Sequence, residues 1–355
     1  MDKVQIKDVA TIVNGSTPST KKPEYWDGDI PWITPKDLSS NHMRFVSKGE
    51  RNITDEGYKS CSTTLLPKGT VLLTSRAPIG YLAIADCPMC TNQGFKSLIC
   101  NQDKILPLYM YYWLSTRVDY LKGISTGATF KELSKSTLEN VEMKLPTNEE
   151  QQHIVGVIGS VDDLIELNAR KIAKIMDFSR LIYSQAKAIS PMKSAGEFIS
   201  FTKGKQADFV NQPTGEPYLT IDVLEGSQEV SYSASGVECG EGDILMVMDG
   251  AASGRCYFGY KGFVGSTLSK IECKGIDSSV AFLALEEHEK DIQKNTTGSA
   301  IPHTDKRYVS DIEIPLIKDE FTVNRLRNLL TLLVSTRKEI RTLREEKEIL
   351  MRKFF

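Results

Sequence analysis

Polar side chains suited to binding phosphates and bases gather in short stretches that follow apolar runs of this sequence. In the first half these stretches are Thr34-Pro35-Lys36, Ser75-Arg76 and Thr91-Asn92-Gln93. In the second half they are Lys203-Gly204-Lys205-Gln206, Ser253-Gly254-Arg255, Gly265-Ser266-Thr267 and His303-Thr304-Asp305-Lys306-Arg307. Such side chains hydrogen-bond to phosphates and to base edges in the grooves of a duplex. Each stretch taken singly is more typical of an ordinary solvated loop, but their recurrence in both halves favours a binding role.

The sequence contains no GxxxxGK[ST], GxGxxG or HExxH pattern, the motifs of phosphate loops, dinucleotide-binding turns and zinc-dependent hydrolases. Seven cysteines, an odd number, indicate reduced thiols rather than a disulfide framework. Cys87 and Cys90 lack the second pair that a zinc site needs. We therefore expect no catalytic residue, no metal ligand and no cofactor held by this chain, which favours a binding protein.

The bulk properties indicate two or three domains, since the chain has 355 residues and 40% hydrophobic composition. Its net charge is −2, but residues 1–145 carry 18 Lys and Arg against 15 acidic residues, whereas residues 189–316 carry 11 against 19. A nucleic-acid function must therefore accommodate an acidic second half. We expect no membrane-spanning segment and no signal peptide, and hence a cytoplasmic location.

An internal repeat relates the two halves of the chain. Four pairs of segments match in the same order: residues 30–34 with 216–220, 67–73 with 240–246, 125–128 with 296–299, and 138–143 with 309–314. A long helical pattern follows the last match in each half. The order of the matches indicates a duplication, and it aligns Met248-Asp249-Gly250 with Ser75-Arg76-Ala77.

Two long stretches carry apolar residues at alternating spacings of four and three, which predicts helices that pack along a seam. The first stretch, residues 149–187, would form a helix of about 57 Å. Its expected seam residues are Ile154, Ile158, Val161, Ile165, Asn168, Ile172 and Ile175. Those of the C-terminal stretch are Leu326, Leu329, Leu333, Ile340, Leu343 and Leu350. Asn168 and Thr336 fall on seam positions, where they either specify the register of the pair or lie at a solvated edge.

The predicted fold is two copies of an α/β (α+β) globular domain, joined by a long antiparallel two-helix coiled coil with a pseudo-twofold internal repeat. The predicted segments are two globular domains, 1–146 and 191–317, and two long helices, 147–190 and 318–355. A rigid helical pair holds two related domains at a fixed distance. A fixed distance between two binding domains matches the regular spacing of duplex DNA, where half-sites on one face lie about 34–36 Å apart per helical turn.

Five stretches of the sequence resemble the specificity subunit of type I restriction–modification enzymes. They are IPWITPKDL (30–38), LLTSRAPIG (72–80), TNQGFKSL (91–98), STGATFKEL (125–133) and VEMKLPTNEEQQHIVGVIGSVDDLIELN (141–168). The resemblance implies a non-catalytic chain in which each globular domain is a target-recognition domain for one half of a split DNA sequence. It also implies DNA-contact residues at Thr34, Lys36, Arg76 and Gln93 in the first domain, and at Lys205, Arg255, Ser266, Lys306 and Arg307 in the second.

The same resemblance implies partners for this chain. Two methyltransferase subunits would dock on the coiled coil and carry S-adenosylmethionine, and restriction subunits would join to form an ATP- and Mg-dependent nuclease. The alternative from another class is a protein–protein scaffold of two α/β modules on a coiled coil, without DNA binding. A minor alternative is a relative that serves a nuclease without ATP.

Overall fold

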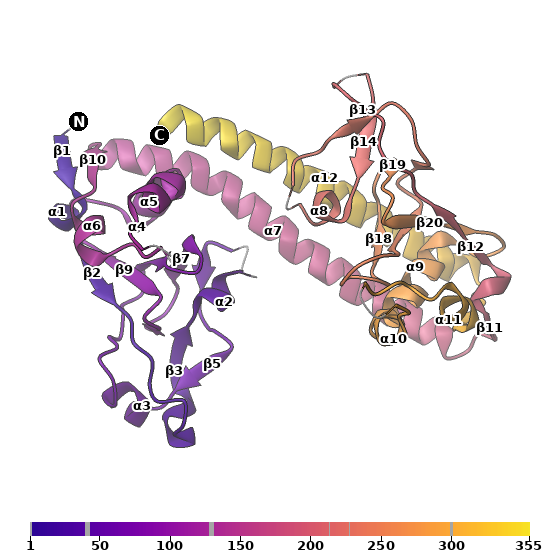
Figure 1. The fold of residues 1–355 in the computed structure, drawn as a ribbon, viewed down its shortest axis with the longest axis horizontal. Coiled ribbons are helices and arrows are strands. Elements are labelled where there is room, and N and C mark those ends of the chain that lie inside the picture. The colour runs from indigo at the N-terminus through magenta and orange to yellow at the C-terminus, as the bar shows by residue number, and fades with distance from the viewer. Residues whose placement is uncertain (1, 40–42, 128–130, 213, 227, 299–300) are drawn as a thin grey trace. The chain divides into compact units, whose positions relative to one another are not determined.

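The computed structural model describes residues 2–39, 43–127, 131–212, 214–226, 228–298 and 301–355. The chain divides into two compact units, one formed by Met1–Glu166 with Leu343–Phe355 and the other by Leu167–Thr342. Figure 1 shows the ribbon of each unit and labels most of their helices and strands. Two long helices contribute to both units, namely α7 (Asn148–Lys187) and α12 (Glu320–Phe354). The four-part division expected from the sequence therefore stays a prediction.

The first unit is built on a five-stranded sheet in the order β2 (Ala10–Asn14), β9 (Phe95–Cys100), β6 (Val71–Ser75), β7 (Ile79–Ala85) and β4 (Phe45–Val46). Every residue of the central strand β6 is buried. Side chains alternate between the faces of a strand, so Val71 and Leu73 enter one hydrophobic cluster while Leu72 enters another. Burial on both faces explains why the sequence of this strand is a continuous apolar run.

Smaller elements complete the first unit. A three-stranded sheet has the order β5 (Arg51–Ile53), β3 (Trp26–Ile33), β8 (Cys90–Thr91), and β1 (Asp2–Gln5) pairs with β10 (Glu142–Leu145). The helices are α1 (Ile6–Val9), α2 (Pro35–Ser39), α3 (Asp55–Lys59), α4 (Pro107–Ser115), α5 (Val118–Ile124), α6 (Lys135–Glu139) and the 3-10 turn η1 (Pro23–Tyr25). Helices α4 and α5 both pack on β7.

The second unit contains a four-stranded sheet in the order β12 (Ile199–Lys203), β20 (Leu268–Cys273), β17 (Ile244–Val247), β18 (Cys256–Phe258). It also contains a five-stranded sheet in the order β13 (Phe209–Val210), β15 (Tyr232–Ser233), β14 (Glu216–Leu219), β19 (Gly262–Val264), β16 (Glu238–Cys239). A third pairs β11 (Met192–Ser194) with β21 (Glu313–Pro315). Its helices are α8 (Ile221–Glu225), α9 (Ser278–Glu287), α10 (Glu289–Lys294), α11 (Lys306–Asp311) and the 3-10 turn η2 (Ala195–Glu197).

The two units repeat one topology, which confirms the predicted duplication. Strand β17 occupies the place of β6: Ile244 and Met246 enter one cluster, and Leu245 and Val247 enter another. The parallel pair β14–β19 corresponds to β3–β8, and the pair β11–β21 corresponds to β1–β10. The fold class expected from the sequence, two α/β units with long helices, is therefore correct.

One helix expected in each unit is divided in two. The apolar pattern of residues 107–122 predicts a single helix, but α4 ends at Ser115 and α5 begins at Val118. Arg117 between them has a non-helical backbone, with φ −114° and ψ 7°. The same break occurs at His288 between α9 and α10. In the first unit the break allows both short helices to contact β7 and to bury Tyr112 and Leu121.

Within each unit, α7 and α12 run antiparallel. In the first unit, His153 stacks edge-on against Phe354, and Asp162 pairs with Lys347, so the contacts run in opposite directions along the two helices. Helix α7 begins with a capping box in which the Thr147 N–H donates to Glu150 Oε2 (2.9 Å) and the Glu150 N–H donates to Thr147 Oγ1 (3.3 Å).

The seam positions expected from the sequence are covered to different degrees. Ile154, Ile158, Ile165, Ile175, Leu326, Leu333, Ile340 and Leu343 are buried, and Val161, Ile172, Leu329 and Leu350 are half-buried. Asn168 and Thr336 are 6% and 1% exposed, so neither lies at a solvated edge. Among the described residues, no helix is long and apolar enough to cross a membrane.

Candidate nucleic-acid interface

The central strand of the first unit ends at a junction of loops. The Ser75 N–H donates to Gly94 O (2.7 Å), and the Asn92 N–H donates to Ile33 O (3.0 Å). The Leu133 N–H donates to Ser75 O (2.9 Å). These bonds bring together the residues that follow β3, β6 and β8. We call this junction the first loop edge; it comprises residues 33–36, 75–77, 91–94 and 132–133.

Two of the four predicted contact residues of this unit stand at the start of α2. The Thr34 N–H and Oγ1–H both donate to Asp37 Oδ2, at 2.7 and 2.6 Å, and the Asp37 N–H donates to Thr34 Oγ1 at 3.4 Å, so the two residues cap the start of the helix reciprocally. Lys36 is exposed and pairs with Glu50 at 2.7 Å. The hydrogen bond that Lys36 donates to Glu50 raises the pKa of Lys36. The ammonium group therefore remains charged and accessible to a phosphate.

The other two lie beside them on the same edge. Arg76 is half-buried and forms an antiparallel backbone bridge with Glu132. The Glu132 carboxylate pairs with Lys96 at 3.4 Å, although the Lys96 side chain is only 8% exposed. Gln93 is exposed, and its Oε1 accepts a hydrogen bond from Thr17 Oγ1. The first loop edge thus gathers cationic, amide and hydroxyl groups, as the sequence led us to expect, but their contact with DNA stays a prediction.

The second unit repeats this junction bond for bond. The Met248 N–H donates to Thr267 O (2.8 Å), the Thr304 N–H donates to Met248 O (2.8 Å), and the Gly265 N–H donates to Leu219 O (2.9 Å). We call it the second loop edge; it comprises residues 203–205, 219–220, 248–250, 264–267 and 303–304. The equivalence confirms the sequence alignment that places Asp249 where the first unit has Arg76.

Two predicted contact residues of the second unit belong to this edge. The Lys205 N–H donates to Val264 O at 3.1 Å. The hydroxyl of Tyr218 links the two residues, because it donates to Lys205 O (2.9 Å) and accepts from the Ser266 N–H (3.2 Å). The Lys205 side chain is exposed, and that of Ser266 is half-buried.

Arg255 lies directly before β18, where its guanidinium binds two carboxylates. It pairs with Glu225 of α8 and, at 3.6 Å, with Glu289 of α10. The Tyr257 hydroxyl donates to the same Glu225 at 2.9 Å. Hydrogen bonding with Tyr257 and Glu225 raises the pKa of Arg255. A phosphate or base would have to compete with these partners, so Arg255 has a structural role besides its predicted one.

The last two predicted residues begin α11. Lys306 is exposed, and its ammonium lies 5.4 Å from the centre of the Phe201 ring. Arg307 is exposed, and its backbone N–H donates to Asp305 Oδ1 at 2.8 Å. Both follow directly after Thr304 of the second loop edge. The structure therefore places them next to that edge, where phosphates are a suitable ligand.

Sequence reasoning missed a buried ionic cluster in the first unit. Arg44 is 5% exposed, and both its N–H and its Nε–H donate to Glu166 Oε1, at 3.0 and 2.9 Å. Its Nη2 donates to Asp163 Oδ1. Burial opposes the charge, but the hydrogen bonds to Glu166 and Asp163 outweigh it and raise the pKa of Arg44. Arg44 thereby fixes the backbone directly before β4 to helix α7.

The cluster extends to the second long helix. The Tyr112 hydroxyl donates to Asp162 Oδ2 at 2.8 Å, and the Lys347 ammonium donates to Asp162 Oδ1 at 2.7 Å. Burial, together with the neighbouring Asp162 charge, raises the pKa of Tyr112. Elements α4, α7 and α12 of the first unit therefore meet around one carboxylate.

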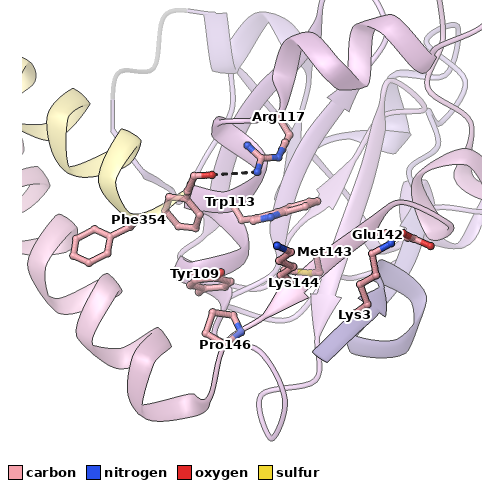
Figure 2. A pocket seen from close by; sticks show the side chains of 10 residues that line it. Lys3, Tyr109, Trp113, Arg117, Glu142, Met143, Lys144, Pro146 and Phe354 are labelled. Carbon is pink, nitrogen blue, oxygen red and sulfur yellow. Dashed lines mark hydrogen bonds and ion pairs between the residues drawn. The ribbon is translucent and has the colours of Figure 1, made fainter. Parts of the chain in front are cut away.

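A pocket of about 400 Å³ lies elsewhere in the first unit, where the end of α12 packs against α4. Figure 2 shows Tyr109, Trp113 and Phe354 around it, with Arg117 donating to the backbone oxygen of Phe355 (3.3 Å). Burial raises the pKa of Tyr109 to about 12. None of the predicted contact residues lines this pocket, so the loop edges remain the candidate site.

The fold is a repeated α/β unit with a polar loop edge in each copy. A family model described as the type I restriction modification DNA specificity domain matches residues 1–177. The MjaIX specificity subunit of Methanocaldococcus jannaschii is 53% identical over 178 residues, which are 50% of this chain and 41% of that protein. The chain belongs to the family of type I restriction–modification specificity subunits.

Two further matches extend over both units. The putative type I specificity subunit S.MgeORF438P of Mycoplasma genitalium is 21% identical over 324 residues, 81% of each chain. A crystal structure of the type I restriction–modification system S subunit from M. genitalium covers 100% of this chain and 96% of its own, with a TM-score of 0.64 and 16% identity, which shows the fold. The chain spans less than half of the MjaIX subunit. The family model describes a DNA specificity domain, which favours DNA recognition over a scaffold without DNA binding.

Proposed function

We propose that this chain is the non-catalytic DNA-specificity subunit of a type I restriction–modification enzyme, and that each unit binds one half of a split DNA sequence. The observation that carries the proposal is the bond-for-bond equivalence of the two loop edges. Each edge presents hydrogen-bonding side chains on a rigid end of a buried strand, as base readout requires. Two similar edges in one chain suit two half-sites. DNA binding also agrees with the cytoplasmic location expected from the sequence.

The acidic composition of the second half is compatible with this function. Phosphate contacts depend on local rather than net charge, and exposed Lys205, Lys306 and Arg307 lie at or beside the second loop edge. Partner subunits would add further phosphate contacts.

The partners follow from the same proposal. Two methyltransferase subunits would dock on the long helices and supply S-adenosylmethionine, the residues for methyl transfer and the pocket for a flipped adenine. Restriction subunits would supply ATP- and Mg-dependent cleavage. Helix α7 exposes apolar side chains suited to such docking: Leu164, Leu167, Phe178 and Leu181 are each 46–58% exposed.

Selection from a library of randomised DNA duplexes, with the full chain alone and with its methyltransferase subunits, tests this function. We expect enrichment of two short sequence blocks separated by an unspecified gap of fixed length. Binding should also weaken steeply with salt, since each phosphate contact contributes a slope of about −0.9 in log K against log salt concentration. A scaffold without DNA binding would enrich no sequence.

A further inference from the structure

The two loop edges carry opposite charges at equivalent backbone positions. In the first unit, Arg76 forms the backbone bridge with Glu132; in the second, Asp249 forms the equivalent bridge with His303. The residue that leaves the central strand is thus a cation in one copy and an anion in the other. An acidic side chain is unfavourable at a surface that approaches phosphates, so its presence there requires a reason.

The backbone holds Asp249 on both sides. The Met248 N–H is bonded to Thr267 O, and the Gly250 N–H donates to Pro302 O at 2.9 Å. The Ser253 hydroxyl also donates to Pro302 O, at 3.0 Å. The Asp249 side chain therefore projects from a fixed point, which is the condition for a specific hydrogen bond.

One oxygen of this carboxylate remains available as an acceptor. Oδ1 lies 2.7 Å from Nδ1 of His303, which orients the group, while Oδ2 forms an ion pair with Nζ of Lys203 at 3.8 Å. The latter distance exceeds that of a hydrogen bond. The Asp249 side chain is 28% exposed and that of His303 is 50% exposed. A carboxylate offers about four acceptor positions, so one bond to His303 leaves capacity for a ligand.

The backbone bridge does not require this pair of side chains. In the first unit the equivalent bridge joins Arg76 and Glu132, but the Glu132 side chain pairs with Lys96 of strand β9, at 3.4 Å. The Asp249–His303 pair is therefore not explained by the loop geometry that both units share.

On the basis of the proposed function, we propose that Asp249 is a specificity-determining residue of the second unit, and that its carboxylate accepts a hydrogen bond from the exocyclic amine of a cytosine in the major groove. Acidic side chains accept from cytosine N4, whereas Arg binds the O6 and N7 atoms of guanine. His303 is a positioning residue that holds the carboxylate in its orientation. Arg76 and Asp249 thus read complementary bases, guanine and cytosine, from equivalent positions of the two units.

The test uses the full chain and a library of randomised DNA duplexes. Asp249→Asn replaces one acceptor by an amide of the same size, and the exchange variant Asp249→Arg/His303→Glu places the pair of the first unit on the second edge. Glu313→Gln, an exposed carboxylate on the separate strand β21, is the matched control. His303→Ala and His303→Gln test positioning, since the Gln amide can restore a donor.

We expect Asp249→Asn to lower the preference for cytosine at one position of one half-site roughly 5- to 150-fold, with the other half-site unchanged. The exchange variant should prefer guanine in the same half-site, and His303→Gln should retain more discrimination than His303→Ala. Enrichment of the unaltered half-site shows that a variant is folded. If Asp249→Asn and the exchange variant enrich the wild-type sequence, the proposal is wrong while the DNA-specificity function stands. If the wild-type chain enriches no sequence, both are wrong.

Discussion

The guanidinium of Arg44 and the carboxylate of Glu166 form a buried ion pair across 122 positions of the chain, with Nε 2.9 Å from Oε1. Arg44 precedes the edge strand β4 of the first globular domain, and Glu166 belongs to α7. The pair therefore fixes the strand that ends the sheet to the helix that the sequence predicts as a spacer. Asp162 and Asp163 of the same helix also pair with the Arg44 guanidinium.

Replacing Arg44 by Met should destabilise the first unit strongly. It removes the guanidinium from the buried Glu166 and Asp162 carboxylates, and breaking one side of a buried ion pair costs about 3–5 kcal/mol. Urea denaturation followed by circular dichroism measures the effect. Lys3→Met is the control, because Lys3 pairs with Glu142 at the surface and its loss should leave the midpoint nearly unchanged. Equal midpoints for the two variants would show that the buried cluster does not stabilise the fold.

Acid should weaken the second unit through Asp277, the N-cap of α9. Its Oδ2 accepts from Nη2 of Arg327 on α12 (2.6 Å), and its Oδ1 accepts from the Ser279 N–H (2.9 Å). Burial opposes ionisation, but the bonds from Ser279 and Arg327 prevail and lower the pKa of Asp277. A lowered pKa means that the stabilisation is complete above the unfolded value of about 3.9 and is lost as the pH falls through the folded value.

Asp277→Asn should therefore be less stable than the wild type at neutral pH, and the difference should shrink as the pH falls below about 4. Thermal melts between pH 3 and 7, with Asp311→Asn as an exposed control, measure this. A difference that stays constant with pH would exclude Asp277 as the source.

Asn168 should reduce stability at its seam position. Its Nδ2 is buried without a hydrogen-bond partner among the described residues, and such a group costs about 1–3 kcal/mol. Asn168→Leu should raise the melting temperature, whereas Asn328→Leu on an exposed helix surface should change it little. A lower melting temperature for Asn168→Leu would mean that the amide stabilises the helix pair.

Arg76 and Lys36 should affect DNA binding differently. If Arg76 reads a guanine, Arg76→Ala should weaken binding to the selected sequence by about 1–3 kcal/mol and relax the preference at one position. Lys36→Ala should weaken binding to all sequences and reduce the salt slope by about 1, as expected for a phosphate contact. Fluorescence anisotropy at several salt concentrations distinguishes the two. If the sequence preference of Arg76→Ala is unchanged, Arg76 does not read a base.

The sequence predicted the parts of this fold that carry a periodic signal. The strands at Val71 and Ile244 were predictable because burial on both faces leaves a continuous apolar run between turn residues. The long helices were predictable because a packed seam repeats over many turns. The internal repeat aligned Asp249 with Arg76, and the equivalent backbone bridges of these two residues confirm that alignment.

Contacts between single residues distant in sequence gave no such signal. Nothing near Arg44 marks it as buried, because its partners lie on α7 more than a hundred positions later. The break between α4 and α5 at Arg117 has no sequence signal, because the apolar pattern continues through it. The break allows both helices to pack on β7, a contact that the sequence does not reveal. His303 stood in a polar loop, but its pairing with Asp249 depends on a backbone bridge that the sequence does not reveal.

The central claim is that two related units on a helical spacer read a split DNA sequence. Its most direct test is to insert seven residues into both α7 and α12, at the unit boundaries after Glu166 and after Thr342, and to repeat the duplex selection. One heptad adds about 10.5 Å of helix, or about three base pairs. We predict the same two sequence blocks with a gap longer by about that amount. An unchanged gap, or a single continuous block for the wild type, would contradict the account.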